Sequence, residues 1–340
     1  MSTRSATDGV HRPDATAAAF AETQRALREG ERFLLTTHEG PDGDALGSLL
    51  ALNEILTSLG KDSLMFLHEK EFPLPLEYRF LPLQEVFHEA PADLSDRTVV
   101  FLDCGNIDRM PVDWLKDGNR ILNIDHHHDN TCFGDVNLVD NDAACTAQIV
   151  YDLATELGAE VTPLIATALY VGLITDTGKF MYENTDARSH RIAAELIEAG
   201  VDVDGIYRRL YERVPTEKLT LIARALETIE RRLDGRLSTS YVSAADYAAT
   251  GADETLTEGL IDFIRSLEGT LVAAMVRDKP DRTGKARKVS LRSTDGSVDV
   301  SEIARSLGGG GHKRAAGFST DLSYDDVVAR LGEIVAEQLG

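Results

Sequence analysis

Residues 120–128 read Arg-Ile-Leu-Asn-Ile-Asp-His-His-His, and the organisation of the whole chain can be worked out from this segment. Its first five residues are short and mostly apolar, as in a strand buried inside a sheet. The rest places one carboxylate and three imidazoles in four consecutive residues, where the strand should give way to a loop. Ligands of parallel α/β sheets bind at the carboxyl ends of the strands. The segment therefore predicts a buried parallel strand that ends at a functional site.

Three more apolar segments precede polar loops upstream of this strand, at 32–37, 63–67 and 98–102. Apolar residues at helical spacing predict helices over 15–29, 45–59, 145–157 and 163–174. Strands that alternate with helices are typical of a doubly wound parallel sheet. We therefore predict the α/β class for this part of the chain.

The pattern changes after residue 185. Residues 185–228 have helical spacing, and a hairpin around Asp234-Gly235 follows. Further predicted elements are strands at 270–277 and 286–293, a helix at 300–307, a glycine run at 308–311 and a final helix from about 324. We therefore predict a catalytic domain at 14–212, a helical linker at 213–232 and a smaller α/β domain at 233–340.

Composition narrows the possible classes of protein. The chain has 340 residues, 43% of them hydrophobic, which is enough to form a large core. Its formal net charge of −22 disfavours long duplex nucleic acid as a partner, because such binding depends on neutralising phosphates with Lys and Arg. No apolar run is long enough for a membrane span, and the N-terminus lacks the apolar centre of a signal peptide, so we expect a cytoplasmic protein. The three cysteines, without CxxC spacing, are expected to be reduced and buried.

Aspartate and histidine recur where the predicted strands and helices of the first domain end. They are His38, Asp42, Asp44, Asp103, Asp125, His126, His127 and Asp176. Each alone would most simply be a turn or capping residue. Together on one sheet they favour a site for Mn²⁺ or Mg²⁺, since converging carboxylates repel one another unless cations neutralise them. Two such ions would suit a phosphoester hydrolase.

These segments resemble, in order, the four motifs of the DHH phosphoesterase superfamily. The motifs are His38-x-x-x-Asp42-x-Asp44, Asp103-Cys-Gly, Asp125-His126-His127 and Thr175-Asp176-Thr-Gly. The glycine run with His312, Lys313 and Arg314 resembles the signature of the associated DHHA1 domain. Asn106 stands where relatives often carry an acidic residue.

The resemblance is to the NrnA-like group. It implies a phosphoesterase that holds two Mn²⁺ ions, with Mg²⁺ as an alternative, and that acts on very short oligoribonucleotides and 3′-phosphoadenosine 5′-phosphate (pAp). Cyclic dinucleotides are a further possible substrate, and a homodimer is expected. A manganese pyrophosphatase and a catalytically inactive nucleotide-binding regulator remain alternatives at this point.

The resemblance also assigns roles to the motif residues. It implies that His38 and Asp42 are ligands of one ion. Asp44, His126 and Asp176 would be ligands of the other ion, and Asp103 would bridge the two. Asp125 would orient an imidazole, and His127 would help the leaving oxygen depart. His128 lies outside the motif and has no expected role.

Substrate contacts are expected from both domains, with the active site in the cleft between them. In the second domain these are Arg292, Gly310, Gly311, His312 and Arg314, because glycines let backbone N–H groups approach a phosphate. In the first domain Phe180, Tyr182 and Arg188 could stack on a base or grip a phosphate, or could simply pack.

Overall fold

The computed structural model describes residues 12–110, 112–118, 120–212, 214–257, 259–279 and 284–340. The first residues of the chain, from which we expect no signal peptide, lie outside these ranges. The chain divides into two compact units, one up to residue 213 and one from residue 214. In the described ranges, none of the helices has both the length and the apolar character that crossing a membrane requires.

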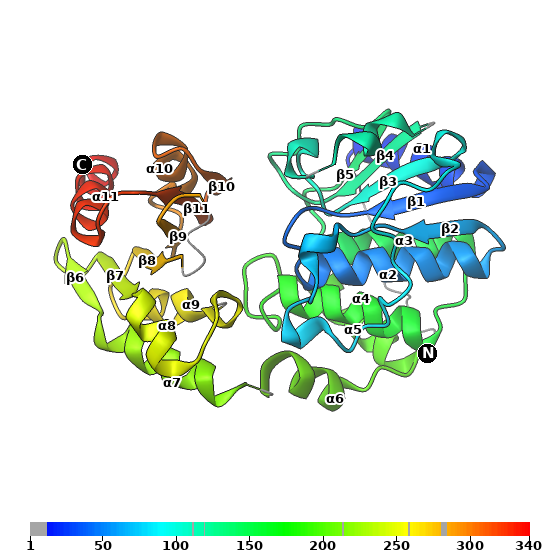
Figure 1. Cartoon of the computed structure of the whole chain (residues 1–340). Coiled ribbons are helices and arrows are strands. Elements are labelled where there is room, and N and C mark those ends of the chain that lie inside the picture. Colours follow the sequence, from blue (N-terminus) through cyan, green and yellow to red (C-terminus); the bar gives the residue numbers. More distant parts are fainter. Residues whose placement is uncertain (1–11, 111, 119, 213, 258, 280–283) are drawn as a thin grey trace. The chain divides into compact units, whose positions relative to one another are not determined.

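The first unit is built on a parallel sheet of five strands in the order β2-β1-β3-β4-β5 (Figure 1). The strands are β1 Arg32–Thr36, β2 Asp62–Met65, β3 Thr98–Leu102, β4 Arg120–Asp125 and β5 Val136–Val139. This order is that of a doubly wound fold whose direction of winding switches between β1 and β3. The predicted sheet is therefore confirmed, with β5 as an additional edge strand.

Helices cover one face of this sheet and build the larger core. The helices α1 Asp14–Glu29, α2 Gly43–Ser58 and α3 Thr146–Leu157 contact the strands. The helix α4 Pro163–Asp176 packs on α2 and α3, α5 Ala187–Glu198 packs on α4, and α6 Val203–Tyr207 follows along the chain. The α4 helix is apolar on nearly all sides, because α2, α3 and α5 pack around it. The opposite face is covered mainly by short 3-10 turns and loops. There Trp114 packs edge-on against Phe66, with the ring centroids 4.7 Å apart. Cys104 and Cys145 are buried as predicted, whereas Cys132 is exposed.

The second unit is a mixed sheet in the order β10-β11-β9-β8-β7-β6 with helices on both faces. Its elements are α7 Thr216–Glu227, β6 Glu230–Arg232, β7 Leu237–Val242, α8 Ala244–Thr250, α9 Leu260–Arg265, β8 Val272–Asp278, β9 Arg287–Ser293, α10 Val300–Ser306, β10 Gly310–His312, β11 Ala315–Thr320 and α11 Tyr324–Leu339. The predicted hairpin is β6-β7. The α7 helix lies in the range expected to be a linker, and it packs on α8, α9 and β7 of this unit.

Candidate metal centre

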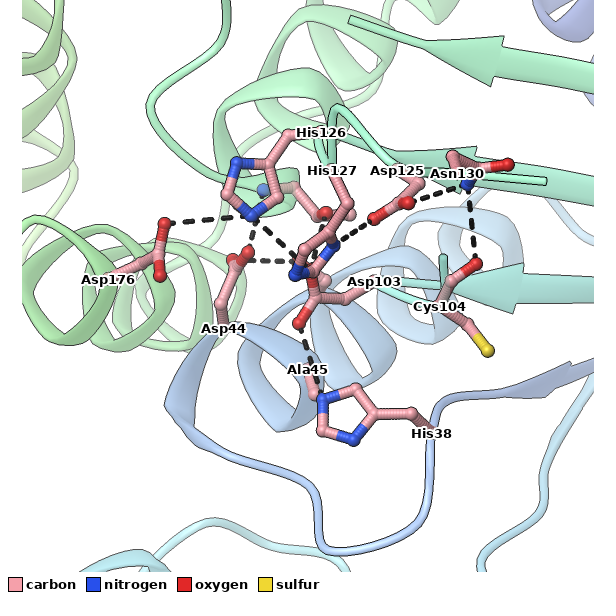
Figure 2. Close-up of polar contacts among 12 residues, drawn as sticks. His38, Asp44, Ala45, Asp103, Cys104, Asp125, His126, His127, Asn130 and Asp176 are labelled. Atoms are coloured by element: carbon pink, nitrogen blue, oxygen red, sulfur yellow. Dashed lines mark hydrogen bonds and ion pairs between the residues drawn. The ribbon is translucent and has the colours of Figure 1, made fainter. Parts of the chain in front are cut away.

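The aspartates and histidines singled out from the sequence meet at the carboxyl edge of the first sheet. His38 follows β1, Asp103 follows β3, and Asp125 is the last residue of β4. Since β1 and β3 are neighbours at the switch point of the sheet, their loops diverge and leave room for a ligand. Figure 2 shows side chains from these loops and from the ends of α2 and α4 converging on one place.

One group that could hold a metal ion consists of His38, Asp42 and Asp103. The Nε2 atom of His38 lies 3.6 Å from Oδ2 of Asp103, and both side chains are almost fully buried. Asp42 is the N-cap of α2, where its Oδ1 accepts hydrogen bonds from the backbone N–H groups of Asp44 and Ala45 at 3.0 and 3.1 Å. The cap fixes one carboxylate oxygen, and the group is the one expected for the first ion.

A second group consists of Asp44, His126 and Asp176. Nε2 of His126 lies 3.7 Å from Oδ2 of Asp176 and 3.6 Å from Oδ1 of Asp103. Asp44 is held in place because its two carboxylate oxygens accept hydrogen bonds from the N–H groups of Thr146 and Ala147 at 2.7 and 2.8 Å. These are the first residues of α3, where N–H groups have no partner within the helix.

Asp103 belongs to the first group and also lies beside His126, so its carboxylate is placed between the two groups. Its backbone is left-handed, with φ of 54°, and its Oδ1 accepts a hydrogen bond from Thr146 Oγ1 at 3.0 Å. Aspartate tolerates this backbone better than most residues do. The bend turns the chain out of β3 and the hydroxyl fixes the carboxylate.

His127 is oriented by a chain of hydrogen bonds behind the site. Its Nδ1 lies 2.7 Å from Oδ1 of buried Asp125, whose other oxygen accepts from Asn130 Nδ2 at 2.6 Å. Burial alone would lower the pKa of His127, but the hydrogen bond to Asp125 and the charge of Asp103 outweigh burial and raise this pKa to about 10. The imidazole that Asp125 orients is therefore that of His127.

The carboxylates of this cluster destabilise one another. Burial, and then the charges of Asp103 and Asp176, raise the pKa of Asp44 well above its usual range. Burial, and then the charges of Asp42 and Asp103, do the same to the pKa of Asp176. Asp103 differs, since burial would raise its pKa but the imidazoles of His38, His127 and His126 hold it low. Cations would relieve this repulsion.

The donor set fits divalent metal ions. It offers carboxylate oxygens and imidazole nitrogens, with none of the three cysteines among its members. Such mixed ligands suit Mn²⁺, Mg²⁺ and related ions better than soft metals. The chemistry of these donors therefore fits a centre for two divalent ions.

Comparisons with known proteins agree with this geometry. The DHH family, N-terminal domain, matches residues 32–173, and the DHHA1 domain matches residues 239–338. The bifunctional oligoribonuclease and PAP phosphatase NrnA of Thermus thermophilus is 36% identical over 324 residues, which cover 94% of this chain and 93% of that protein. The chain belongs to the DHH family.

Two solved structures share the fold of this DHH protein. An exopolyphosphatase-related protein from Bacteroides fragilis superposes with a TM-score of 0.85 at 21% identity, covering 94% of this chain and 96% of that one. RecJ of Thermus thermophilus in complex with Mn²⁺ gives a TM-score of 0.55 at 17% identity, with coverage of 97% and 56%.

Several residues that support the DHH cluster were not indicated by the sequence. They are Thr146, Asn130, Asn184 and Arg109. Asn184 Nδ2 donates to the backbone oxygens of Ala144 and Asp176 at 2.9 and 3.1 Å and lies 3.3 Å from Oδ2 of Asp176. Of these four residues, only Thr146 could have been identified from the sequence, because it lies at the start of a predicted helix.

Two neighbours of the DHH motifs lie outside both ligand groups. His128 is exposed, in keeping with its having no expected role. Asn106 uses its side chain to accept a hydrogen bond from the N–H of Asp108 at 2.9 Å. Asn106 therefore acts as the cap of the 3-10 turn Ile107–Arg109.

The first unit's three expected substrate contacts take part in packing. Phe180 stacks on His190 with ring centroids 4.9 Å apart, and Arg188 pairs with buried Asp152. Tyr182 is 44% exposed, and its ring lies over Gly178, where a Cβ would meet it at 2.4 Å. Of the three, Tyr182 offers the most surface to a ligand.

The second unit brings the other expected substrate contacts onto adjacent strands. Ala315 of β11 pairs with Arg292 on one side and with position 312 of β10 on the other, while the His312 side chain lies outside the described part of the structure. Arg314 Nη2 donates to the backbone oxygen of Asp295 at 3.3 Å. These positions therefore share one end of the sheet.

The glycines of this segment have different structural roles. A Cβ at Gly309 would meet the backbone oxygen of Gly317 at 2.1 Å, and one at Gly311 would meet that of Ala315 at 2.6 Å. A Cβ at Gly310 would meet nothing within 4 Å. Close packing against β11 therefore explains Gly309 and Gly311, whereas Gly310 borders open space that a ligand could approach.

Proposed function

We propose that this chain is a two-metal phosphoesterase. Its substrates would be very short oligoribonucleotides, which it would hydrolyse to 5′-mononucleotides, and pAp, from which it would remove one phosphate. The observation that supports this most is that the six residues expected as metal ligands lie together at the carboxyl edge of the first sheet. The chain also matches, over 94% of its length, a relative named for these two activities.

His38, Asp42 and Asp103 would hold one ion, and Asp44, His126 and Asp176 the other, with Asp103 shared. Mn²⁺ is the ion we propose, because the donors are mixed and a fold relative was solved with it. Bound divalent ions would supply positive charge at the phosphoryl group and lower the pKa of a water.

The chain's own residues would supply the proton chemistry. Asp125 and Asn130 hold the His127 ring, so that Nδ1 is engaged with Asp125. The ring would then donate a proton from Nε2 to the departing ribose oxygen. His127 and Asp125 are thus the proposed catalytic pair beside the shared ligand Asp103.

The second unit would recognise the substrate through positions 292, 310, 311, 312 and 314. A small anion suits the charge of the chain, since a local cationic group can attract it where the net charge of −22 repels a long polyanion. Lys285 and Arg287 are paired with Asp321 and Asp278 at 3.0 Å, so they contribute less to such a local field.

One assay tests the proposed function. The purified protein with Mn²⁺ is incubated separately with a linear dinucleotide, pAp, a cyclic dinucleotide and pyrophosphate, and the products are separated. Turnover of the dinucleotide and pAp is expected. Turnover of pyrophosphate alone would refute the proposal in favour of a pyrophosphatase, and binding without any turnover would favour a regulator. The cyclic dinucleotide decides whether the substrate range is wider.

Gly310→Ala tests whether the open side of the glycine run receives substrate. We expect the KM for pAp to rise about tenfold, because a new methyl group would stand where the backbone is approached closely. The melting temperature should stay unchanged, since no atom lies within 4 Å of the added Cβ. Gly332→Ala, in α11 with equally open surroundings, is the control. An unchanged KM would remove Gly310 from the substrate site.

A further inference from the structure

Arg109 is an exposed cation at the edge of the metal centre. It ends the 3-10 turn Ile107–Arg109, six residues after Asp103, and its Nη2 lies 3.0 Å from Nδ1 of His38. The chain carries 57 acidic and 35 basic residues, yet within the ranges that the structure describes no carboxylate pairs with Arg109. Among the described residues, its side-chain hydrogen bond is made with the imidazole of His38.

This contact competes with another. Nδ1 of His38 also lies 2.8 Å from the backbone oxygen of Glu39, which can only accept a hydrogen bond. Arg109 can only donate one. A single ring nitrogen cannot satisfy both, because it must carry a proton for Glu39 and a lone pair for Arg109.

Metal ligation decides between the two partners. His38 presents Nε2 to Asp103, so Nε2 must carry the lone pair when His38 is a ligand. Nδ1 then carries the proton and donates to the oxygen of Glu39, as ligating imidazoles usually do with their second nitrogen. Arg109 loses its acceptor, and two N–H donors then face each other.

We propose that Arg109 is a substrate-binding residue that leaves His38 when the metal centre is loaded and then binds the phosphate of the nucleotide. This inference rests on the proposed function for the identity of its anion. The planar guanidinium forms charge-assisted pairs with phosphate oxygens, and the exposed side chain can reach solvent and ligand alike. The first unit thereby supplies its own phosphate contact.

The backbone of Arg109 is anchored independently of its side chain. Its carbonyl oxygen accepts from the N–H of Glu39 at 3.1 Å, and its N–H donates to the oxygen of Asn106 at 3.1 Å. A side-chain substitution therefore leaves the loop that carries His38 attached. Arg109→Gln is therefore expected to remove the guanidinium without disturbing the backbone of this loop.

The test compares Arg109→Gln with Arg120→Gln, an exposed arginine that pairs with Glu22. Titration calorimetry measures Mn²⁺ binding first, and then AMP binding to the Mn²⁺-loaded protein. For Arg109→Gln we expect AMP affinity to fall about tenfold, the loss of one charge-assisted hydrogen bond, while Mn²⁺ affinity is unchanged or tighter. Arg120→Gln should change neither.

A purely structural role predicts a different pattern. If Arg109 only orients His38, Arg109→Gln should weaken Mn²⁺ binding, and that result would overturn the inference. Unchanged AMP affinity, or an absence of AMP binding to the wild-type protein, would also overturn it. The proposed function fails separately, if the wild-type protein turns over neither dinucleotide nor pAp, because the binding measurements do not depend on turnover.

Discussion

Asp103→Asn should lower kcat for pAp and for a dinucleotide by about a thousandfold or more, with the fold retained. The substitution removes the negative charge of the one carboxylate placed between the two ligand groups. A neutral amide is a poor ligand for two cations at once, and the loss of charge stabilisation at the reacting phosphoryl group is large. Mn²⁺ affinity, measured by titration calorimetry, should fall in parallel.

Asparagine is a better substitution here than alanine. Residue 103 has a φ of 54°, a region that asparagine enters far more readily than alanine does. Its amide oxygen can still accept from Thr146 Oγ1, so the melting temperature should change by only a few degrees. Asp108→Asn, an exposed residue of the following turn, is the matched control. Near-normal turnover by Asp103→Asn would show that the shared-ligand assignment is wrong.

The part of the site predicted from sequence was the part encoded locally. His38, Asp103 and the pair His126 and His127 each follow a strand directly, and parallel strands bring their carboxyl ends to one edge. Strand order then decides which loops meet, and here β1 and β3 are adjacent. A pattern of strand followed by Asp or His was therefore enough to bring these residues together, whereas Asp44 and Asp176 come from the ends of helices α2 and α4.

The supporting contacts could not be predicted in the same way. The N–H groups that hold Asp44 come from residues more than 100 positions further along the chain, at Thr146 and Ala147. Backbone N–H groups carry no signal in the residue type, since every residue except proline has one. Asn184 likewise reaches Asp176 through a loop whose course depends on packing. Such contacts follow from tertiary structure alone.

The glycine run shows a different limit of prediction from sequence. Four glycines looked alike in sequence, as a segment that could receive an anion. In the structure Gly309 and Gly311 are required by the close approach of β11, whereas Gly308 and Gly310 border open space and Gly308 has a left-handed backbone with φ of 81°. A glycine in the sequence does not show whether a neighbouring strand or a bound ligand occupies the space that a Cβ would need.

His127→Gln should lower kcat for a dinucleotide by about a hundredfold or more while leaving Mn²⁺ affinity nearly unchanged. His127 also forms a possible ligand group with Asp103 and His126, but its Nδ1 is engaged with Asp125, which Asn130 holds in turn, so we assign it to neither ion. General acid catalysis of this kind typically contributes at least such a factor. The adjacent exposed residue provides a matched control, since His128→Gln should retain wild-type kinetics.

The leaving group distinguishes proton donation from simple charge stabilisation. A ribose oxygen must be protonated as it departs, whereas p-nitrophenolate departs as a stable anion. The loss caused by His127→Gln should therefore be far smaller for the p-nitrophenyl ester of a nucleoside 5′-phosphate than for a dinucleotide. An equal loss on both substrates would mean that His127 binds the phosphoryl group and does not act as the acid. In that case the hydrogen bond that His127 donates to Asp125 would serve only to fix the ring.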